Sequence, residues 1–325
     1  MKEFKLFILS CFAIICVALF GSVFTSCSND DDLFLADDSQ TGQVFSHSAD
    51  SLKSMTRGGS TSTIGTSNLN NDVLVIDNHD VCYITFTPSP SYSAMLTNAN
   101  IDVYVKLTKA GAGWSSWITM TKGSLNFSCY FDPYNSGYSA GRYIVSFYFS
   151  TTPGGTKYST GNNSENIIVT SNSDNYSSLC WYHQTIDGVN YDQRGFAMLN
   201  CTSWVAGKIN ELWGTSSDFY NSMTSPALSH AKFWKDRLVA AGYSADQTNP
   251  QAGDIIWWPA SGNGSLKNGH VGYVYKVTSS TIYYTDYNHT GNGEFGARTL
   301  NNNSSSIGTK WFIHMQIQWC ICLFT

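Results

Sequence analysis

The feature that most constrains this chain is a change in the spacing of its apolar residues near position 171. Before it, apolar side chains alternate with more polar ones, as Val103, Val105 and Leu107 do. Period-two alternation predicts strands with one buried and one solvated face. Several such short runs are separated by Pro, Gly, Asn and Ser. The pattern predicts an all-β, immunoglobulin-like sandwich over residues 71–171.

From residue 172 onward, helical spacing appears together with strand spacing. Residues 201–212 carry apolar side chains at helical intervals, and Gly214 is placed to end that helix. A second helix is expected over residues 229–241. Four strands are expected after it, over 254–258, 270–277, 281–287 and 311–317. Helices followed by an antiparallel meander predict an α+β domain over residues 172–325.

The first 26 residues have the properties of an export signal. Lys2 and Lys5 precede an apolar stretch that is too short for a comfortable membrane span. Ser26 stands directly before Cys27, and this pair resembles a lipobox. We therefore expect a lipoprotein signal peptide over residues 1–26, with Cys27 as the lipidated first residue of the mature chain.

The residues after Cys27 indicate how the folded part of the chain is attached to the membrane. Residues 28–32 resemble the acidic export tag of Bacteroidetes surface lipoproteins. Residues 27–70 are rich in Ser, Asp, Thr and Gly, which predicts a disordered tether. We expect an outer membrane lipoprotein held by its lipid anchor, on the periplasmic face or at the cell surface.

Charge and cysteine usage exclude some classes of partner. The formal net charge is −5 and no Lys/Arg run is present, so we expect no nucleic-acid partner. No C-x-x-C pair is present, so we expect no metal site.

Cys82 and Cys129 fall on the apolar phase of their strands and could form a disulfide across the sandwich, or remain buried thiols. The pattern indicates no role for Cys180 or for the apolar chain end.

One cysteine stands where a nucleophile would be activated. Cys201 begins the first expected helix of the α+β domain. The N-terminus of a helix carries partial positive charge and free N–H groups, which favour a thiolate and can stabilise an oxyanion. The alternative is a structural thiol.

Three polar residues further along could complete a catalytic set. His270 follows Gly269 at the start of a strand and could act as the base for a thiol. Asp286 and Asn288 are two positions apart, so on a strand both would face the same way. Either could accept the second imidazole N–H of His270 and orient the ring. The alternative for Asn288 is that it only opens the turn that follows.

Together these segments resemble the CHAP family of cysteine, histidine-dependent amidohydrolases and peptidases. The resemblance rests on residues 200–206, 250–255, 269–274 and 286–288. It implies a papain-like α+β fold with N-terminal helices and an antiparallel sheet. It also implies that Cys201 is the nucleophile and His270 the base, with Asp286 and Asn288 in the third role. Asp stands at 286 where the family more commonly has Glu.

The resemblance implies that the chain is a peptidoglycan hydrolase that needs no metal or organic cofactor. The amide bond would be cut either as an N-acetylmuramoyl-L-alanine amidase or as an endopeptidase of the stem peptide. One alternative is a surface lipoprotein that binds a glycan or protein on a non-hydrolytic CHAP scaffold. Another is a cysteine protease acting on proteins. The pattern does not identify a ligand for the sandwich.

Overall fold

The computed structural model describes residues 64–96, 101–160, 165–216, 218–262 and 265–315. The expected export signal, the lipidation site Cys27, most of the expected tether and the chain end at 316–325 lie outside the described residues. Within the described part of the chain, no helix is both long and apolar enough to cross a membrane. Two regions are described in turn, a β-domain from Gly65 to Thr170 and a C-terminal domain from Tyr176 onward.

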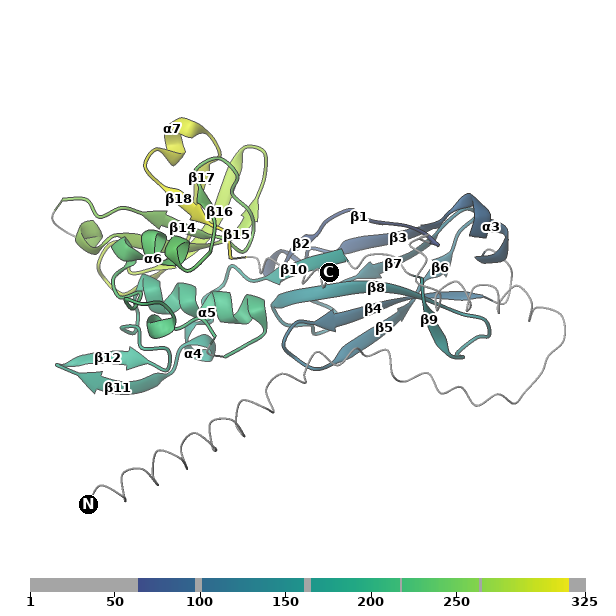
Figure 1. Ribbon diagram of the computed structural model, residues 1–325, viewed down its shortest axis with the longest axis horizontal. Helices are drawn as coiled ribbons and strands as arrows, with labels where there is room; N and C mark the ends of the chain where they lie inside the picture. Colours follow the sequence, from purple (N-terminus) through teal and green to yellow (C-terminus); the bar gives the residue numbers. More distant parts are fainter. Residues whose placement is uncertain (1–63, 97–100, 161–164, 217, 263–264, 316–325) are drawn as a thin grey trace, which may run out of the picture. The chain divides into compact units, whose positions relative to one another are not determined.

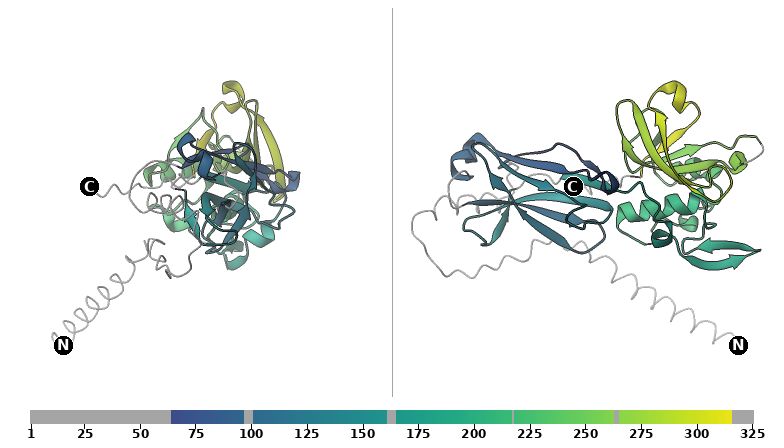
Figure 2. Two further views of the ribbon diagram at one scale, coloured as in Figure 1. Left: turned by 90° about the vertical axis from the view of Figure 1, so that its right-hand side faces the viewer. Right: turned by 180° about the vertical axis from the view of Figure 1, so that it is seen from behind.

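The β-domain consists of two sheets (Figures 1 and 2). The first has the order β1-β3-β7-β6, with strands Gly65–Leu69, Cys82–Pro88, Phe127–Phe131 and Thr121–Lys122. The second has the order β2-β10-β8-β4-β5, with strands Val73–Val75, Glu165–Thr170, Gly141–Ser150, Asp102–Lys109 and Ser115–Thr119; β9 (Lys157–Ser159) pairs with β8. Every pair is antiparallel except β2 with β10. The connections contain η2 (Ile76–Asn78) and α3 (Pro90–Leu96).

One apolar core joins the two sheets of the β-domain. The alternating residues Val103, Val105 and Leu107 of β4 are fully buried in it. Phe86 from the first sheet stacks on Phe147 from the second, with ring centroids 5.5 Å apart. Burying side chains of this size stabilises a fold by about 1.5–3 kcal/mol each, so alternation explains why these segments are strands. The immunoglobulin-like relationship stays a prediction.

The β-domain begins earlier than expected. β1 covers Gly65–Leu69 and pairs with β3, from Gly65 opposite Pro88 to Leu69 opposite Ile84. The prediction of a disordered tether up to residue 70 is therefore wrong for these residues. Their side chains are mostly solvated because β1 lies at a sheet edge, and an edge strand can keep a linker-like composition while its backbone pairs.

Of the two alternatives for Cys82 and Cys129, the structure shows the buried thiols and not a disulfide across the sandwich. Both are free, and both belong to the first sheet, on the adjacent strands β3 and β7. Cys82 lies opposite Phe131, and Cys129 lies opposite Ile84, so the two thiols are diagonal neighbours on one face. The alternation placed both side chains in the core correctly, but it could not show which sheet each strand joins.

The C-terminal domain combines short helices with one antiparallel sheet (Figure 1). Its helical elements are α4 (Tyr176–Leu179), α5 (Cys201–Trp213), η3 (Asn221–Met223), η4 (Ala231–Phe233), α6 (Trp234–Ala240), η5 (Ser265–Asn268) and α7 (Ser304–Ile307). A hairpin of β11 (Tyr182–Ile186) and β12 (Val189–Asp192) precedes α5. The sheet has the order β13-β18-β14-β15-β16-β17, with strands Ala245–Asp246, Trp311–Ile313, Ile255–Trp258, His270–Val277, Thr281–Tyr287 and Phe295–Asn301.

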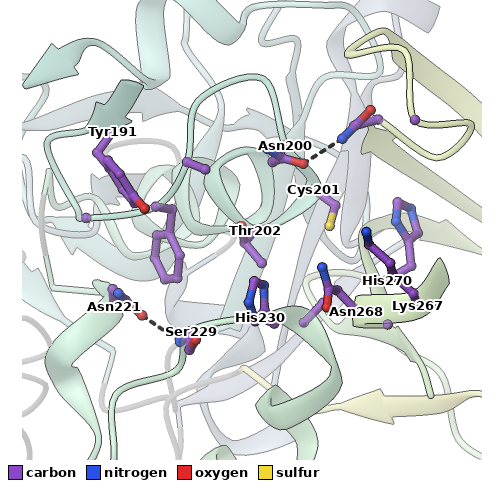
Figure 3. Close-up of a pocket in the computed structure, with 17 residues that line it drawn as sticks. Tyr191, Asn200, Cys201, Thr202, Asn221, Ser229, His230, Lys267, Asn268 and His270 are labelled. Carbon is purple, nitrogen blue, oxygen red and sulfur yellow. Dashed lines mark hydrogen bonds between the residues drawn. The ribbon is translucent and has the colours of Figure 1, made fainter. Parts of the chain in front are cut away.

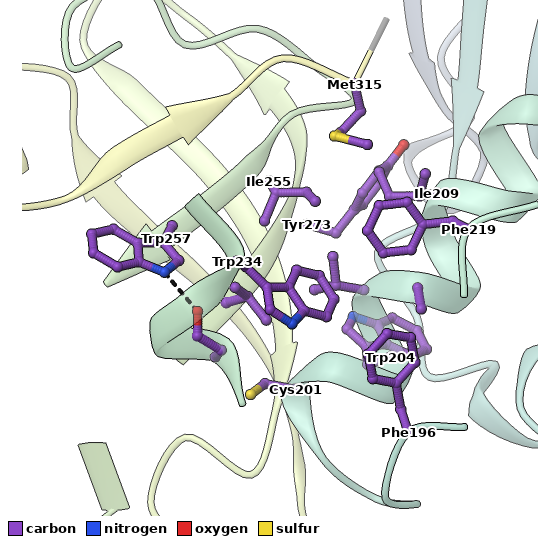
Figure 4. Packing of buried hydrophobic residues seen from close by; sticks show 14 of the residues in the cluster. Phe196, Cys201, Trp204, Ile209, Phe219, Trp234, Ile255, Trp257, Tyr273 and Met315 are labelled. Carbon is purple, nitrogen blue, oxygen red and sulfur yellow. Dashed lines mark hydrogen bonds between the residues drawn. The ribbon is translucent and has the colours of Figure 1, made fainter. Parts of the chain in front are cut away.

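Helix α5 is the element that positions the site. Asn200 precedes it in an extended conformation, and Gly214 ends it in the left-handed region at φ 74°. Trp204 is fully buried, and its indole N–H donates to Thr285 Oγ1 at 3.1 Å, which attaches the helix to β16. Figure 4 shows Trp204 and Ile209 packed among the buried residues of the domain, with Cys201 at the margin of this cluster.

Candidate active site

Cys201 is the first residue of α5, and its side chain is 9% exposed. It is a free thiol. No side chain caps the helix start, and the first hydrogen bond into the helix is donated by Trp204 to the carbonyl of Asn200. The N–H groups of the first turn therefore have no partner within the helix and face the region of the thiol.

His270 is the first residue of β15, and it is 2% exposed. Its Nε2 donates to Asp286 Oδ2 at 3.0 Å. The side chain of Cys201 is close enough to the ring to affect its pKa. Because Nε2 is engaged by Asp286, Nδ1 is the ring nitrogen left for the thiol. Figure 3 shows Cys201 and His270 projecting into one pocket.

The surroundings of His270 favour its charged form. Burial alone would lower the pKa of His270, but Cys201 and Asp286 together raise it to about 9. The ring can therefore hold a proton at neutral pH although it is almost inaccessible to water. A buried imidazole between a thiol and a carboxylate is the arrangement that nucleophilic thiol chemistry requires.

Asp286, on β16, is fully buried and touched by three nitrogen-bearing side chains. In addition to His270, Arg298 donates its Nε to both carboxylate oxygens, at 3.0 and 3.1 Å. His289 Nδ1 lies 3.1 Å from Oδ2, but its orientation is unsuitable for a hydrogen bond. Burial would raise the pKa of Asp286, whereas His270, His289 and Arg298 hold it well below its ordinary value. Asp286 is therefore anionic when it orients His270.

Trp258 closes the apolar side of this cluster. Its ring lies 5.3 Å from that of His270 and 6.2 Å from that of His289, centroid to centroid. It is 9% exposed, and its neighbour Trp257 is 7% exposed with its indole N–H bonded to the carbonyl of Ala231. Both side chains belong to the core, where Trp258 restricts the plane of the catalytic candidate His270.

A pocket of about 460 Å³ opens in front of the thiol (Figure 3). Cys201 and His270 lie in its wall, together with Tyr191, Thr202, Asn221, His230, Lys267 and Asn268, among others. Of the described residues that line it, none is an aspartate or glutamate, and Lys267 is the one lysine or arginine. The described lining therefore carries no negative side chain and one positive side chain, which suits anionic groups better than cationic ones.

Comparison with known proteins agrees with this geometry. Residues 190–288, which include Cys201, His270 and Asp286, match the family model of the CHAP domain. The chain carries a CHAP domain. A crystal structure of an N-acetylmuramoyl-L-alanine amidase from Staphylococcus aureus is 27% identical, with 35% of this chain and 29% of that chain covered and a TM-score of 0.28. No curated protein sequence matches the chain.

Asn288 does not take the role that the sequence predicted as one option. Asn288 lies beyond the strand, because β16 ends at Tyr287 and Asn288 has φ 60°, so the strand alternation on which the expectation was based does not reach it. The side chain of Asn288 donates to Asn200 Oδ1 at 2.6 Å and accepts from the Gly293 N–H at 2.8 Å. Asn288 therefore binds the residue before Cys201, and Asp286 alone engages the second nitrogen of His270.

Two residues of this cluster were not predicted from the sequence. Arg298 lies on β17, a strand of mixed polarity whose alternation is too weak to stand out, and its partner Asp286 is visible only once β16 and β17 pair. His289 lies directly after Asn288, where the sequence pattern indicates only a turn. The signal that could have revealed them is the need of a buried aspartate for compensating charge.

The same cluster offers ligand atoms that a metal ion could use. One atom each from His270, Asp286 and His289 lie within 4.8 Å of one another. Arg298 places its positive charge on the same carboxylate, and this charge repels a second cation there. The hydrogen bonds to Asp286 explain the cluster of the CHAP domain without a metal.

Proposed function

We propose that the CHAP domain is a thiol-dependent hydrolase that cuts an amide bond in the stem peptide of peptidoglycan. The observation that carries the proposal is a set of three side chains. Cys201 and His270 lie in the wall of one pocket, and the ring of His270 donates to the buried carboxylate of Asp286. The Cys201 end of this set of side chains lies in the wall of a pocket that a substrate can enter.

In the proposed reaction, the proton of the Cys201 thiol already resides on His270, and the thiolate sulfur attacks the carbonyl carbon of the amide. The C–N bond then breaks, and His270 gives its proton to the departing amine. The product is a thioester on Cys201. A water molecule, deprotonated by His270, attacks the thioester and releases the carboxylic acid, which leaves the thiolate beside protonated His270.

The start of α5 supplies the stabilisation that the first step needs. Negative charge develops on the carbonyl oxygen as the carbon becomes tetrahedral. The first-turn N–H groups beside Cys201 have no helical partner and can donate to that oxygen. Fixed donors of this kind typically contribute about 10²–10³-fold to the rate.

The lining of the pocket supports a substrate that carries carboxylates. Stem peptides present several carboxylates, and Lys267 together with His230 offers nitrogen groups to them. No described carboxylate in the lining repels such a ligand. A peptidoglycan fragment is therefore a better match to the pocket than a basic peptide.

The proposal is tested by digesting purified sacculi and identifying the fragments by mass spectrometry. The wild-type chain should release fragments with a new amine and a new carboxylate, and Cys201→Ala should lower the rate by about 10³-fold or more. Cys129→Ala is the matched control, because it removes a buried thiol from the β-domain and should leave the rate unchanged.

The fragments also assign the bond. A free L-alanine amine identifies an amidase, and a cut between stem residues identifies an endopeptidase. The proposal fails if no sacculus is cleaved, or if Cys201→Ala releases fragments as fast as the wild type. Cleavage of casein in place of sacculi would identify a protease of proteins.

The way in which the chain is held at the envelope is part of the proposal. We infer that Cys27 is lipidated and that the lipid anchors the chain to the outer membrane. Radiolabelled palmitate should be incorporated into the wild type and not into Cys27→Ala, and the variant should leave the membrane fraction. Labelling of both chains alike would contradict the anchor. The β-domain then serves as a spacer or targeting module.

A further inference from the structure

The backbone just before Cys201 has an unusual conformation. Leu199, two residues before the thiol, has φ 54°, in the left-handed region that a residue with a Cβ adopts reluctantly. Its side chain is 49% exposed, so packing of that side chain does not hold it. The turn that delivers the chain into α5 must be held through its backbone.

A buried tyrosine provides that hold. The N–H of Leu199 donates to the phenolic oxygen of Tyr176 at 2.7 Å. The same oxygen lies 2.8 Å from Oγ of Ser203, in the first turn of α5. Tyr176 thus bonds to the residue two positions before Cys201 and to the residue two positions after it.

Counting protons gives these hydrogen bonds a direction. Ser203 donates its only hydroxyl proton to Asp192 Oδ2 at 2.6 Å. Tyr176 must therefore donate to Ser203, and it accepts from Leu199. Burial raises the pKa of Tyr176 above its ordinary range, so the phenol keeps this proton. The chain of bonds runs from the Leu199 backbone to the carboxyl group of Asp192.

The far end of this chain is also fixed. Asp192 is fully buried, and its Oδ1 accepts the N–H groups of Arg194 and Phe196 at 2.9 and 3.0 Å. Ser203 is fully buried as well. Tyr176 is therefore held between the backbone of the turn and a buried acceptor fixed by its own hydrogen bonds, so its oxygen can set the position of Leu199.

We propose that Tyr176 is a positioning residue for the thiol, a brace that holds the turn before Cys201 in register with the first turn of α5. It lies outside residues 190–288, the segment that matches the CHAP family model. The inference rests on the proposed function, because the brace matters only if Cys201 and the adjacent N–H groups act on a carbonyl. Misplacement of reacting groups by about 1 Å can cost roughly 10²-fold in rate.

The test compares Tyr176→Phe with Tyr287→Phe. The Tyr287 hydroxyl donates to Asp174 at 2.7 Å, and its ring lies 4.7 Å from that of Tyr176. Tyr176→Phe loses two hydrogen bonds of its phenol and Tyr287→Phe loses one, in the same part of the core, but only Tyr176 bonds to the turn before the thiol. Tyr176→Phe should lower kcat by about 10–100-fold with KM nearly unchanged. Tyr287→Phe should stay within about twofold of the wild type.

A second readout separates this inference from the proposed function. The rate at which iodoacetamide alkylates Cys201 needs no substrate, and it should fall in Tyr176→Phe but not in Tyr287→Phe. If the wild type cleaves no sacculus, the proposed function fails, while the alkylation contrast still tests the brace. Should Tyr176→Phe not fold, Ser203→Ala takes its place, with a smaller fall expected. Equal rates in all these variants, or an equal fall in both tyrosine variants, would overturn the inference.

Discussion

Two regions of this molecule bury free thiols, and Cys129 and Cys201 have different neighbours. In the β-domain, Cys129 is 8% exposed, and in the CHAP domain Cys201 is 9% exposed. Burial among apolar side chains raises the pKa of Cys129 to about 12 and that of Cys82 to about 11. Cys201 differs because it begins a helix and faces His270. On the proposed function, we expect the reactivity of each thiol to follow the partner of its sulfur and not its exposure.

The largest effect is expected from removing the charge behind His270. Asp286→Asn keeps the shape of the side chain but loses the charge that stabilises the imidazolium. We expect kcat/KM to fall by about 10³–10⁴-fold, measured with muropeptide substrates. Arg298 is partly solvated, so its loss of a partner should destabilise the fold only slightly.

Asp254→Asn is the matched control for this variant. Asp254 is also fully buried and paired with a histidine, since His314 Nδ1 lies 3.0 Å from its Oδ2. That pair does not touch Cys201, so the control should retain activity within about threefold, as expected for a substitution outside the reacting groups. A similar loss in both variants would mean that buried charge in general, and not the partner of the thiol, separates the two regions.

A smaller effect is expected from pH. The folded pKa of His270 is raised from 6.5 to about 9, so the imidazolium persists below pH 9 and is lost as pH rises through 9. The stability that it contributes is likewise fully present below pH 6.5 and lost through pH 9. The rate should fall by about tenfold per pH unit above that point. Initial rates between pH 6 and 10.5 check this, and a rate that is flat to pH 10 would contradict it.

The smallest effect is expected on stability, in the other region. Cys129→Ser places a hydroxyl in an apolar core without a polar partner and should lower the free energy of unfolding by about 1–3 kcal/mol. Hydrolysis should not change, because the thiol takes no part in it. Urea unfolding of the variant and of Cys129→Ala measures the difference. If the folded Cys129→Ser variant lost hydrolytic activity, the expected difference between Cys129, a structural thiol, and Cys201, the nucleophile, would be contradicted.

The sequence predicted those features that depend on local pattern. Alternation identified β4 and the core position of Val103, since a half-buried strand leaves that trace in composition. Helical spacing predicted α5 with Cys201 at its start. His270 and Asp286, predicted from their motifs, do come together in the structure, because β15 and β16 are sequential and pair directly.

Features that depend on pairing at a distance could not be predicted. Asn288 leaves its strand at a positive φ, which no alternation reveals. Arg298 reaches Asp286 only through the pairing of β16 with β17. The relation of Cys82 to Cys129 depends on which strands are neighbours, and β1 is paired although its composition is that of a linker. In each case, the local sequence pattern around the residue does not indicate which distant residue it contacts.

The central claim is that Cys201 is reactive because of His270, and site-resolved alkylation tests it most directly. The folded chain is treated with iodoacetamide at pH 7.5, and each cysteine is followed by peptide mass spectrometry. We expect rapid labelling of Cys201, slowed at least about tenfold by His270→Ala, with Cys82, Cys129 and Cys180 unlabelled until denaturant is added. Labelling of Cys201 that is no faster than that of Cys129, or that is indifferent to His270→Ala, would contradict it.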